Sequence, residues 1–99
     1  MVTQSHRYTY YEDSDCILEY EIYQNIFVLH AKMYTWNSKS LRKAYRVFNT
    51  FISEARCIKG VEVMSFTPNP KFAKLFGATS LGKFNYDNLE YEVLKWELD

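Results

Sequence analysis

The sequence predicts a mixed α/β (α+β) domain built around a strand–helix–strand unit. Seven apolar residues recur at steps of three and four between positions 38 and 55, which is the spacing of one stripe along an α-helix. A segment dense in apolar and β-branched residues, 25–35, precedes this helix, and a second one, 61–67, follows it. A strand, a helix and a strand in this order predict two parallel strands joined by a crossover helix. The seven residues are Leu41, Ala44, Tyr45, Phe48, Phe51, Ile52 and Ala55.

Composition limits the class of protein. A chain of 99 residues predicts one domain, here 1–99, and 47% hydrophobic with 18% aromatic residues predict a packed core. The formal net charge is zero, so nothing global indicates nucleic acid or an anionic membrane as a partner. No run of about 18 apolar residues predicts a membrane span, and no Cys or His spacing predicts a metal site. We expect a cytoplasmic protein, or one carried in a particle assembled in the cytoplasm.

The first half of the chain predicts a hairpin. Residues 1–15 are polar and aromatic, which favours a loose segment or, alternatively, an edge strand formed by its tyrosines. Cys16–Tyr23 alternates apolar and polar residues, as a half-buried strand does. Gln24 and Asn25 predict a two-residue turn into a nearly continuous apolar strand over 26–35, which suits a central position covered on both faces.

The helix that follows has clear signals at both ends. Asn37 or Ser38 can cap its first turn, it should end near Cys57, and Gly60 suits a left-handed position beyond that end. A strand over 61–67 comes next.

The last third of the chain predicts a short helix and a second hairpin. Asn69 as cap and Pro70 at the first position predict a helix over 70–76, which Gly77 ends. Asp87 and Asn88 predict a turn between strands over 83–86 and 89–98. The predicted order is β-β-α-β-α-β-β, in a mixed and mostly antiparallel sheet.

The segment after the long helix contains Gly60, a strand, Asn69 and the run Phe-Ala-Lys-Leu-Phe-Gly-Ala at 72–78. Together with the order of elements, this segment resembles the GNAT superfamily of acyl-CoA N-acyltransferases. Members commonly show a strand, an asparagine and a short helix that ends in a pattern like Leu-Tyr-x-x-x-Gly-Phe. The version here is most similar to the small GNAT-like proteins encoded by tailed phages. The resemblance covers roughly residues 17–98 and implies a truncated GNAT-like fold.

The resemblance also implies an acetyl-CoA site. In GNAT proteins two strands splay apart, and the free backbone of the first one pairs with the pantetheine amides of the cofactor. That strand corresponds to Leu29, Ala31 and Met33. The pyrophosphate of the cofactor lies at the N-terminus of the long helix, where free N–H groups favour anions. By resemblance the remaining cofactor-binding positions are Asn37, Ser38, Lys39, Ser40, Arg42 and Asn69.

Two departures from the family pattern predict a degenerate site. The phosphate loop of the family usually contains glycines, and residues 35–41 contain none. The tyrosine that often protonates the leaving thiolate is replaced by Ala73, which cannot donate a proton. We therefore expect a small accessory module, too altered for fast transfer, that binds a protein partner such as a host or virion component.

Two other functions remain open. An acetyl-CoA-dependent N-acetyltransferase would use His30 or Glu62 as base, although either side chain also suits a structural position in its strand. A nucleic-acid-binding protein would use a basic stripe with aromatic residues nearby. That stripe consists of Lys39, Arg42, Lys43, Arg46 and Lys71.

Overall fold

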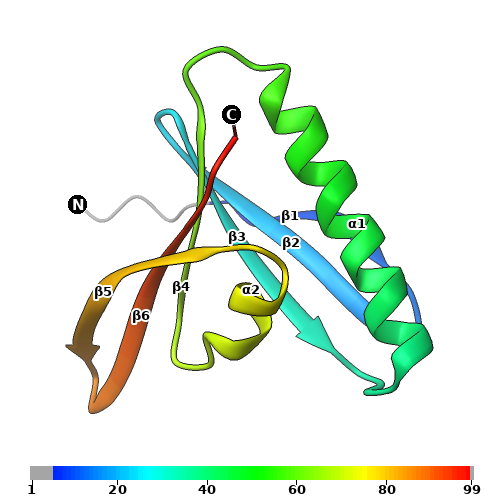
Figure 1. The fold of residues 1–99 in the computed structure, drawn as a ribbon. Coiled ribbons are helices and arrows are strands. Elements are labelled where there is room, and N and C mark those ends of the chain that lie inside the picture. Colours follow the sequence, from blue (N-terminus) through cyan, green and yellow to red (C-terminus); the bar gives the residue numbers. More distant parts are fainter. Residues whose placement is uncertain (1–5, 99) are drawn as a thin grey trace.

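The structure, a computed structural model that describes residues 6–98, is one six-stranded mixed sheet with two helices (Figure 1). The strand order is β1-β2-β3-β4-β6-β5, and in the described chain only β3 and β4 pair in parallel. The predicted fold class is confirmed. The elements are β1 (Tyr8–Glu12), β2 (Cys16–Tyr23), β3 (Ile26–Met33), α1 (Ser38–Arg56), β4 (Glu62–Thr67), α2 (Lys71–Leu75), β5 (Thr79–Tyr86) and β6 (Leu89–Trp96).

The strand β1 precedes the predicted order of elements. It pairs antiparallel with β2 at one edge of the sheet, so the alternative of an edge strand is the correct one for Tyr8–Glu12. The ring of Tyr10 packs edge-on against Phe51 of α1, with 5.0 Å between the centroids. Burial, together with the nearby Glu54, raises the pKa of Tyr10 to about 12. This aromatic contact holds the edge strand to the core; residues 1–5 of the expected loose segment lie outside the described chain.

The helix α1 begins and ends where the sequence predicts. Of the two candidate caps it is Asn37 that accepts from the backbone N–H of Ser40, at 2.8 Å, and Ser40 Oγ accepts from the backbone N–H of Asn37 in return. This capping box satisfies donors that the first turn would otherwise leave unpaired. The C-cap is Cys57, and Gly60 has φ +82°, as predicted.

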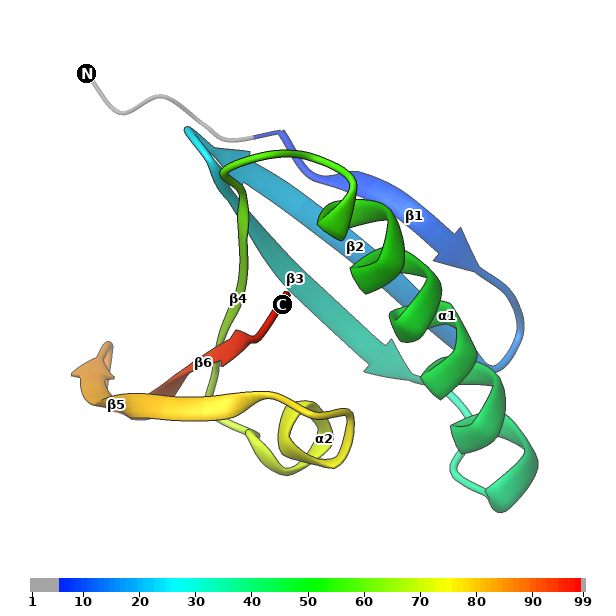
Figure 2. The same ribbon diagram turned by 45° about the horizontal axis from the view of Figure 1, so that its top comes forward.

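Both described helices pack on the same face of the sheet (Figure 2). Phe48 of α1 contacts two rings at α2, with centroid distances of 5.5 Å to Phe72 and 4.9 Å to Phe76. Together with apolar side chains from β2, β3, β4 and β6, these rings form one core. The fully buried members from the sheet are Leu18, Leu29, Val63 and Leu94.

The short helix α2 differs from its prediction at the start. Its N-cap is Pro70 and it has no side-chain cap, so the expectation that Asn69 caps it is wrong. A five-residue helix has little stability of its own, because few of its backbone groups pair within it, so its structure depends on tertiary contacts. Packing holds it instead: Trp96 Nε1 donates to the Phe76 carbonyl at 3.0 Å, and Lys74 forms an ion pair of 2.8 Å with the buried Glu92. The lysine lowers the pKa of Glu92.

The C-terminal hairpin turns at Asp87 and Asn88, both with positive φ, as the sequence predicts. Its first strand is longer than expected and begins at Thr79 instead of 83. Between residues 6 and 98 no helix has both the length and the apolar composition to cross a membrane.

A backbone prediction follows from Gly77, which has φ +98° and ends α2. A Cβ added there would meet no atom within 4 Å, so the cost of a side chain is conformational and not steric crowding. Gly77→Val should lower the free energy of unfolding by about 1–2 kcal/mol, because β-branched residues avoid positive φ. Thr79→Val, on an exposed strand position nearby, is the control and should be neutral in the same chemical denaturation experiment. Equal midpoints for Gly77→Val and the wild type would contradict this account.

Candidate functional site

The two parallel strands pair over only part of their length. Their register runs from Ile26 opposite Glu62 to Val28 opposite Met64 and then stops. Beyond that point β4 pairs only with β6, while β3 continues to Met33 beside β2. Figure 2 shows β3 and β4 diverging in a V that opens toward α2. The expected central strand with both faces covered is therefore wrong for the second half of β3, where Ala31 and Lys32 are exposed.

One edge of β3 consequently faces the V with its backbone groups. At the apex Ser65 Oγ donates to the Leu29 carbonyl at 3.3 Å, which identifies the side of β3 to which Leu29 points its N–H and C=O. Because these groups alternate between the two sides of a strand, those of Ala31 and Met33 point the same way. In the described residues no strand pairs with this edge beyond Val28.

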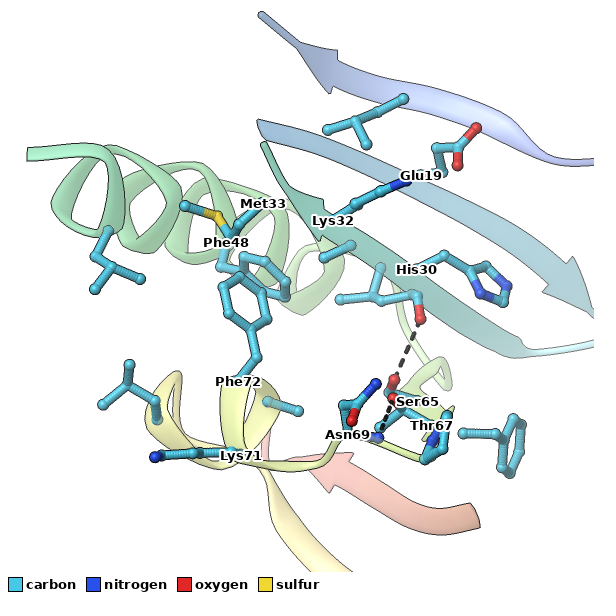
Figure 3. Close-up of a pocket in the computed structure, with 18 of the residues that line it drawn as sticks. Glu19, His30, Lys32, Met33, Phe48, Ser65, Thr67, Asn69, Lys71 and Phe72 are labelled. Carbon is cyan, nitrogen blue, oxygen red and sulfur yellow. Dashed lines mark hydrogen bonds between the residues drawn. The ribbon is translucent and has the colours of Figure 1, made fainter. Parts of the chain in front are cut away.

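The V encloses a cleft, here called the splay cleft, with a volume of about 1120 Å³. Residues of β3 line one wall, and Ser65, Thr67 and Asn69 line the other (Figure 3). Aromatic rings from α1 and α2 line the side toward the core, and Trp36 and Leu75 are exposed members of the lining. A volume of this size accommodates a ligand as large as a typical cofactor.

The predicted phosphate-binding residues lie beside the splay cleft and not in its lining. Asn37 and Ser40 are occupied by the capping box, and Ser40 Oγ also donates to the Thr35 carbonyl at 2.7 Å. Ser38, Lys39 and Arg42 are exposed in the first turns of α1. The structure thus brings Leu29, Ala31, Met33 and Asn69 together in one cleft and places the other five at its margin.

One cation of the basic stripe is engaged by the turn between β1 and β2. Lys43 Nζ lies 2.6 Å from Asp13 and 2.5 Å from Asp15. Asp13 also accepts from the Tyr11 hydroxyl and from the backbone N–H groups of Asp15 and Cys16. Hydrogen bonds from Lys43, and secondarily from Tyr11, hold the pKa of Asp13 far below its usual range, and the two carboxylates raise the pKa of Lys43. Lys43 therefore anchors α1 to the turn between β1 and β2. Because the two carboxylates already neutralise its charge, it is poorly suited to bind an anionic ligand.

This anchor predicts a dependence of stability on pH. A carboxyl whose pKa is lower in the folded than in the unfolded chain stabilises the fold above its ordinary pKa, and this contribution disappears as the pH falls. Asp13→Asn should lower the thermal midpoint at pH 7 and make the loss of stability below about pH 5 shallower than in the wild type. Asp87→Asn, in the exposed turn between β5 and β6, is the matched control. Parallel acid unfolding curves for Asp13→Asn and the wild type would argue against the anchor.

His30 lies on the sheet face opposite the helices and is part of a cluster. Its Nε2 is 2.5 Å from Oε1 of Glu21, a carboxylate that is only 10% exposed. Glu21 also accepts from Tyr23 at 2.9 Å and from Arg7 at 3.4 Å. An ionised Glu21 carboxylate can only accept, so it would pair with a protonated Nε2 and leave Nδ1 of a neutral ring with its lone pair. His30 lines the splay cleft, so this arrangement can place a base there.

The second predicted base lies elsewhere. Glu62 is opposite Ile26, in the paired part of the two strands, and forms an ion pair of 3.3 Å with Lys95. It does not line the splay cleft. The two candidates are therefore at different ends of β3 and β4.

Sequence reasoning missed Glu21, although the signal was present. The two-residue turn at Gln24 and Asn25 sets the register of the hairpin, which places Glu19 directly opposite His30. Glu21 is then the diagonal neighbour on the same face, within reach of an imidazole. The cleft residues Trp36, Ser65 and Tyr91 had no such signal, because they come from segments far apart in the chain.

The comparisons with known proteins address the fold. No protein-family model matches the sequence, and no curated protein matches it. The structure is similar to the crystal structure of an aminoglycoside 6'-acetyltransferase type Ii, with a TM-score of 0.69 and 12% sequence identity. The match covers 86% of this chain, which spans 62% of the length of the other. The six-stranded mixed sheet with its splayed parallel pair therefore has a GNAT-like fold, as the sequence predicts.

Proposed function

We propose that the protein binds the pantetheine arm of an acyl thioester in the splay cleft and acts as a small accessory module with a degenerate acyl-CoA site. The observation that supports this most is the free edge of β3 between Leu29 and Met33, which faces a cleft of about 1120 Å³. A pantetheine arm contains two amides and can pair with such an edge as an added strand does.

The chemistry around the cleft favours binding over fast transfer. Ala73 lines the cleft where the family has a proton donor, and a methyl group cannot protonate a leaving thiolate. Tyr34 also lines the cleft, but its hydroxyl donates to Glu12 at 3.3 Å. Partial burial, and after it the nearby carboxylate of Glu12, raises the pKa of Tyr34, which makes it a poorer acid.

An N-acyltransferase is the second candidate, and the contact between His30 and Glu21 favours it. In that reaction the amine nitrogen of an acceptor bonds to the thioester carbonyl carbon and the C–S bond breaks. The amine proton passes to Nδ1 of His30, and the thiolate leaves as a thiol after taking a proton from water. Glu21 is a positioning residue here, because it orients the ring and does not contact the reacting atoms.

Titration calorimetry with acetyl-pantetheine and acetyl-CoA tests the proposal. We expect weak binding of both, with affinities within a few-fold of each other, since little in the structure is built to hold the phosphates. The difference between them should shrink as salt is added, because exposed charges are screened over about 10 Å at 0.1 M ionic strength. Absence of binding by either compound would overturn the proposal.

Release of free thiol from acetyl-CoA in the presence of an amine tests the second candidate. If the protein is an N-acyltransferase, His30→Gln should lower the rate by about 100-fold or more, which is the usual contribution of a positioned base. Glu62→Gln is the matched control and should leave the rate unchanged. No thiol release above the buffer rate, with binding intact, would leave the accessory module as the function.

The remaining parts of the proposal concern the origin of the protein, its location and a possible nucleic-acid partner. Origin in a phage and a place in the cytoplasm or the virion are supported by the resemblance of residues 17–98 to small phage proteins. The neighbouring genes would test both. Nucleic-acid binding has less support, because Lys43 in the middle of the basic stripe is balanced by Asp13 and Asp15.

A further inference from the structure

From the mouth of the splay cleft we infer that the acyl donor is a pantetheine arm carried on an acidic protein, in preference to free acetyl-CoA. This inference rests on the proposed function, since it names the carrier of the same arm in the same cleft. It depends on two observations: the surface beside the cleft lacks a built site for nucleotide phosphates, and the mouth presents a broad apolar and basic surface.

The first observation concerns the N-terminus of α1. Phosphates held at a helix N-terminus require free backbone N–H groups and a close approach of the backbone. Here the N–H groups of Ser40 and Leu41 donate to Asn37, and the Ser40 side chain is buried in the capping box. Segment 35–41 contains no glycine, so every residue carries a Cβ that limits how closely its backbone can approach a ligand. The free pyrophosphate of CoA therefore has few convergent donors to contact.

The second observation concerns the rim of the mouth. Trp36 and Leu75 line the cleft, and 65% and 61% of their surfaces are exposed. Trp36 packs edge-on against Phe72, with 6.0 Å between centroids, and is therefore held in place although it is exposed. Apolar side chains presented this openly around a cleft are typical of a surface that a protein covers, and phosphates would gain nothing from them.

Two lysines line the cleft, and two more cations belong to the first turns of the neighbouring helix α1. Lys32 on β3 and Lys71 on α2 lie on opposite sides of the cleft (Figure 3), and Lys39 and Arg42 belong to the first turns of α1. Among residues 6–98 no ion pair engages any of the four, whereas Lys43 and Lys74 nearby are each paired with a carboxylate. The four cations come from three different elements, β3, α1 and α2.

Charge complementarity identifies the partner. A cleft with unpaired cations and exposed apolar groups in and beside its lining suits a partner with an acidic face and a few apolar side chains. If the ligand of the cleft is a pantetheine arm, such a partner is an acidic carrier protein that bears the arm on a serine through one phosphate. Carrier and arm would then bind together: the protein face on the rim, and the arm along the edge of β3.

An acidic bacterial acyl carrier protein is a suitable probe, used in apo, holo and acetylated forms. By calorimetry we expect the acetylated carrier to bind about tenfold tighter than both the apo carrier and acetyl-CoA at low salt. The double variant Lys39→Glu, Arg42→Glu, which lies outside the cleft lining, should lose about tenfold in affinity for the carrier and retain its affinity for acetyl-pantetheine. Both side chains are exposed, so the fold should persist. Lys59→Glu, in the loop at the far end of α1, is the matched control and should bind as the wild type does.

The outcomes separate this inference from the proposed function. If acetyl-CoA binds as tightly as the acetylated carrier, the donor is the free cofactor and the inference fails while the proposed function stands. If apo and holo carrier bind equally, the rim docks a protein without using the arm, which also overturns the inference. If acetyl-pantetheine, acetyl-CoA and the carrier all fail to bind, the proposed function fails with it.

Discussion

Phe48→Ala should lower the free energy of unfolding by about 3–5 kcal/mol, the usual cost of removing a buried phenyl group. Phe48 is 4% exposed and lies where α1, α2 and β6 meet, against Phe72, Phe76 and Trp96. For a domain of this size such a loss is a large share of the total stability, which is typically about 5–15 kcal/mol. The urea midpoint should fall steeply while the slope of the transition stays unchanged.

Tyr45→Ala is the matched control for this variant. Tyr45 belongs to the same apolar stripe and touches Phe76, yet it is 48% exposed. Its loss should cost clearly less than that of Phe48, because much of the ring already contacts water. If the two variants lowered the midpoint equally, the packing of α1 on α2 through Phe48 would be contradicted.

Ala31→Trp should abolish binding of acetyl-pantetheine, with a loss of about 100-fold or more in affinity, or about 2.8 kcal/mol. The alanine lines the splay cleft from the exposed half of β3, so an indole placed there occupies the space that the arm requires. The exposed position should tolerate the new side chain, and the thermal midpoint should change little. Calorimetry and a thermal melt on the same sample measure both quantities.

Two further variants make this result specific. Thr9→Trp adds the same ring to an exposed position of the edge strand β1 and should leave binding intact. Ala31→Ser changes the polarity of the position with little change in volume and should bind nearly as the wild type does. Full binding by Ala31→Trp would show that the arm, if it binds at all, does so outside the splay cleft.

Short-range patterns account for the features that could be predicted. The apolar spacing of Phe48, Phe51 and Ile52 determines which face of α1 is buried, and this pattern needs no knowledge of the partner elements. The turns at Gln24 and at Asp87–Asn88 are determined by residues that tolerate positive φ. The resemblance of residues 60–78 to the GNAT family predicted the GNAT-like fold, although only a few residues in this segment match the family pattern.

The errors also have a physical explanation. Asn69 is a good cap by composition, but α2 is held by Trp96 and Glu92 from a strand twenty residues later in the chain. The strand Tyr8–Glu12 was ambiguous because a lone edge strand with alternating tyrosines gains its stability from the neighbour that it pairs with. Local propensity is weak in both segments, so tertiary contacts decide their structure.

The sequence by itself determined the order of the main elements and the buried face of α1, and the family resemblance pointed to Leu29, Ala31 and Met33. Only the tertiary structure decided that β4 leaves β3 after Met64 to pair with β6, which opens the splay cleft. It also decided that Lys43 is bound by Asp13 and Asp15, and that His30 meets Glu21. Periodicity and turns depend on neighbours within about four residues, whereas the divergence of two strands depends on contacts between segments far apart in the chain, which no local pattern encodes.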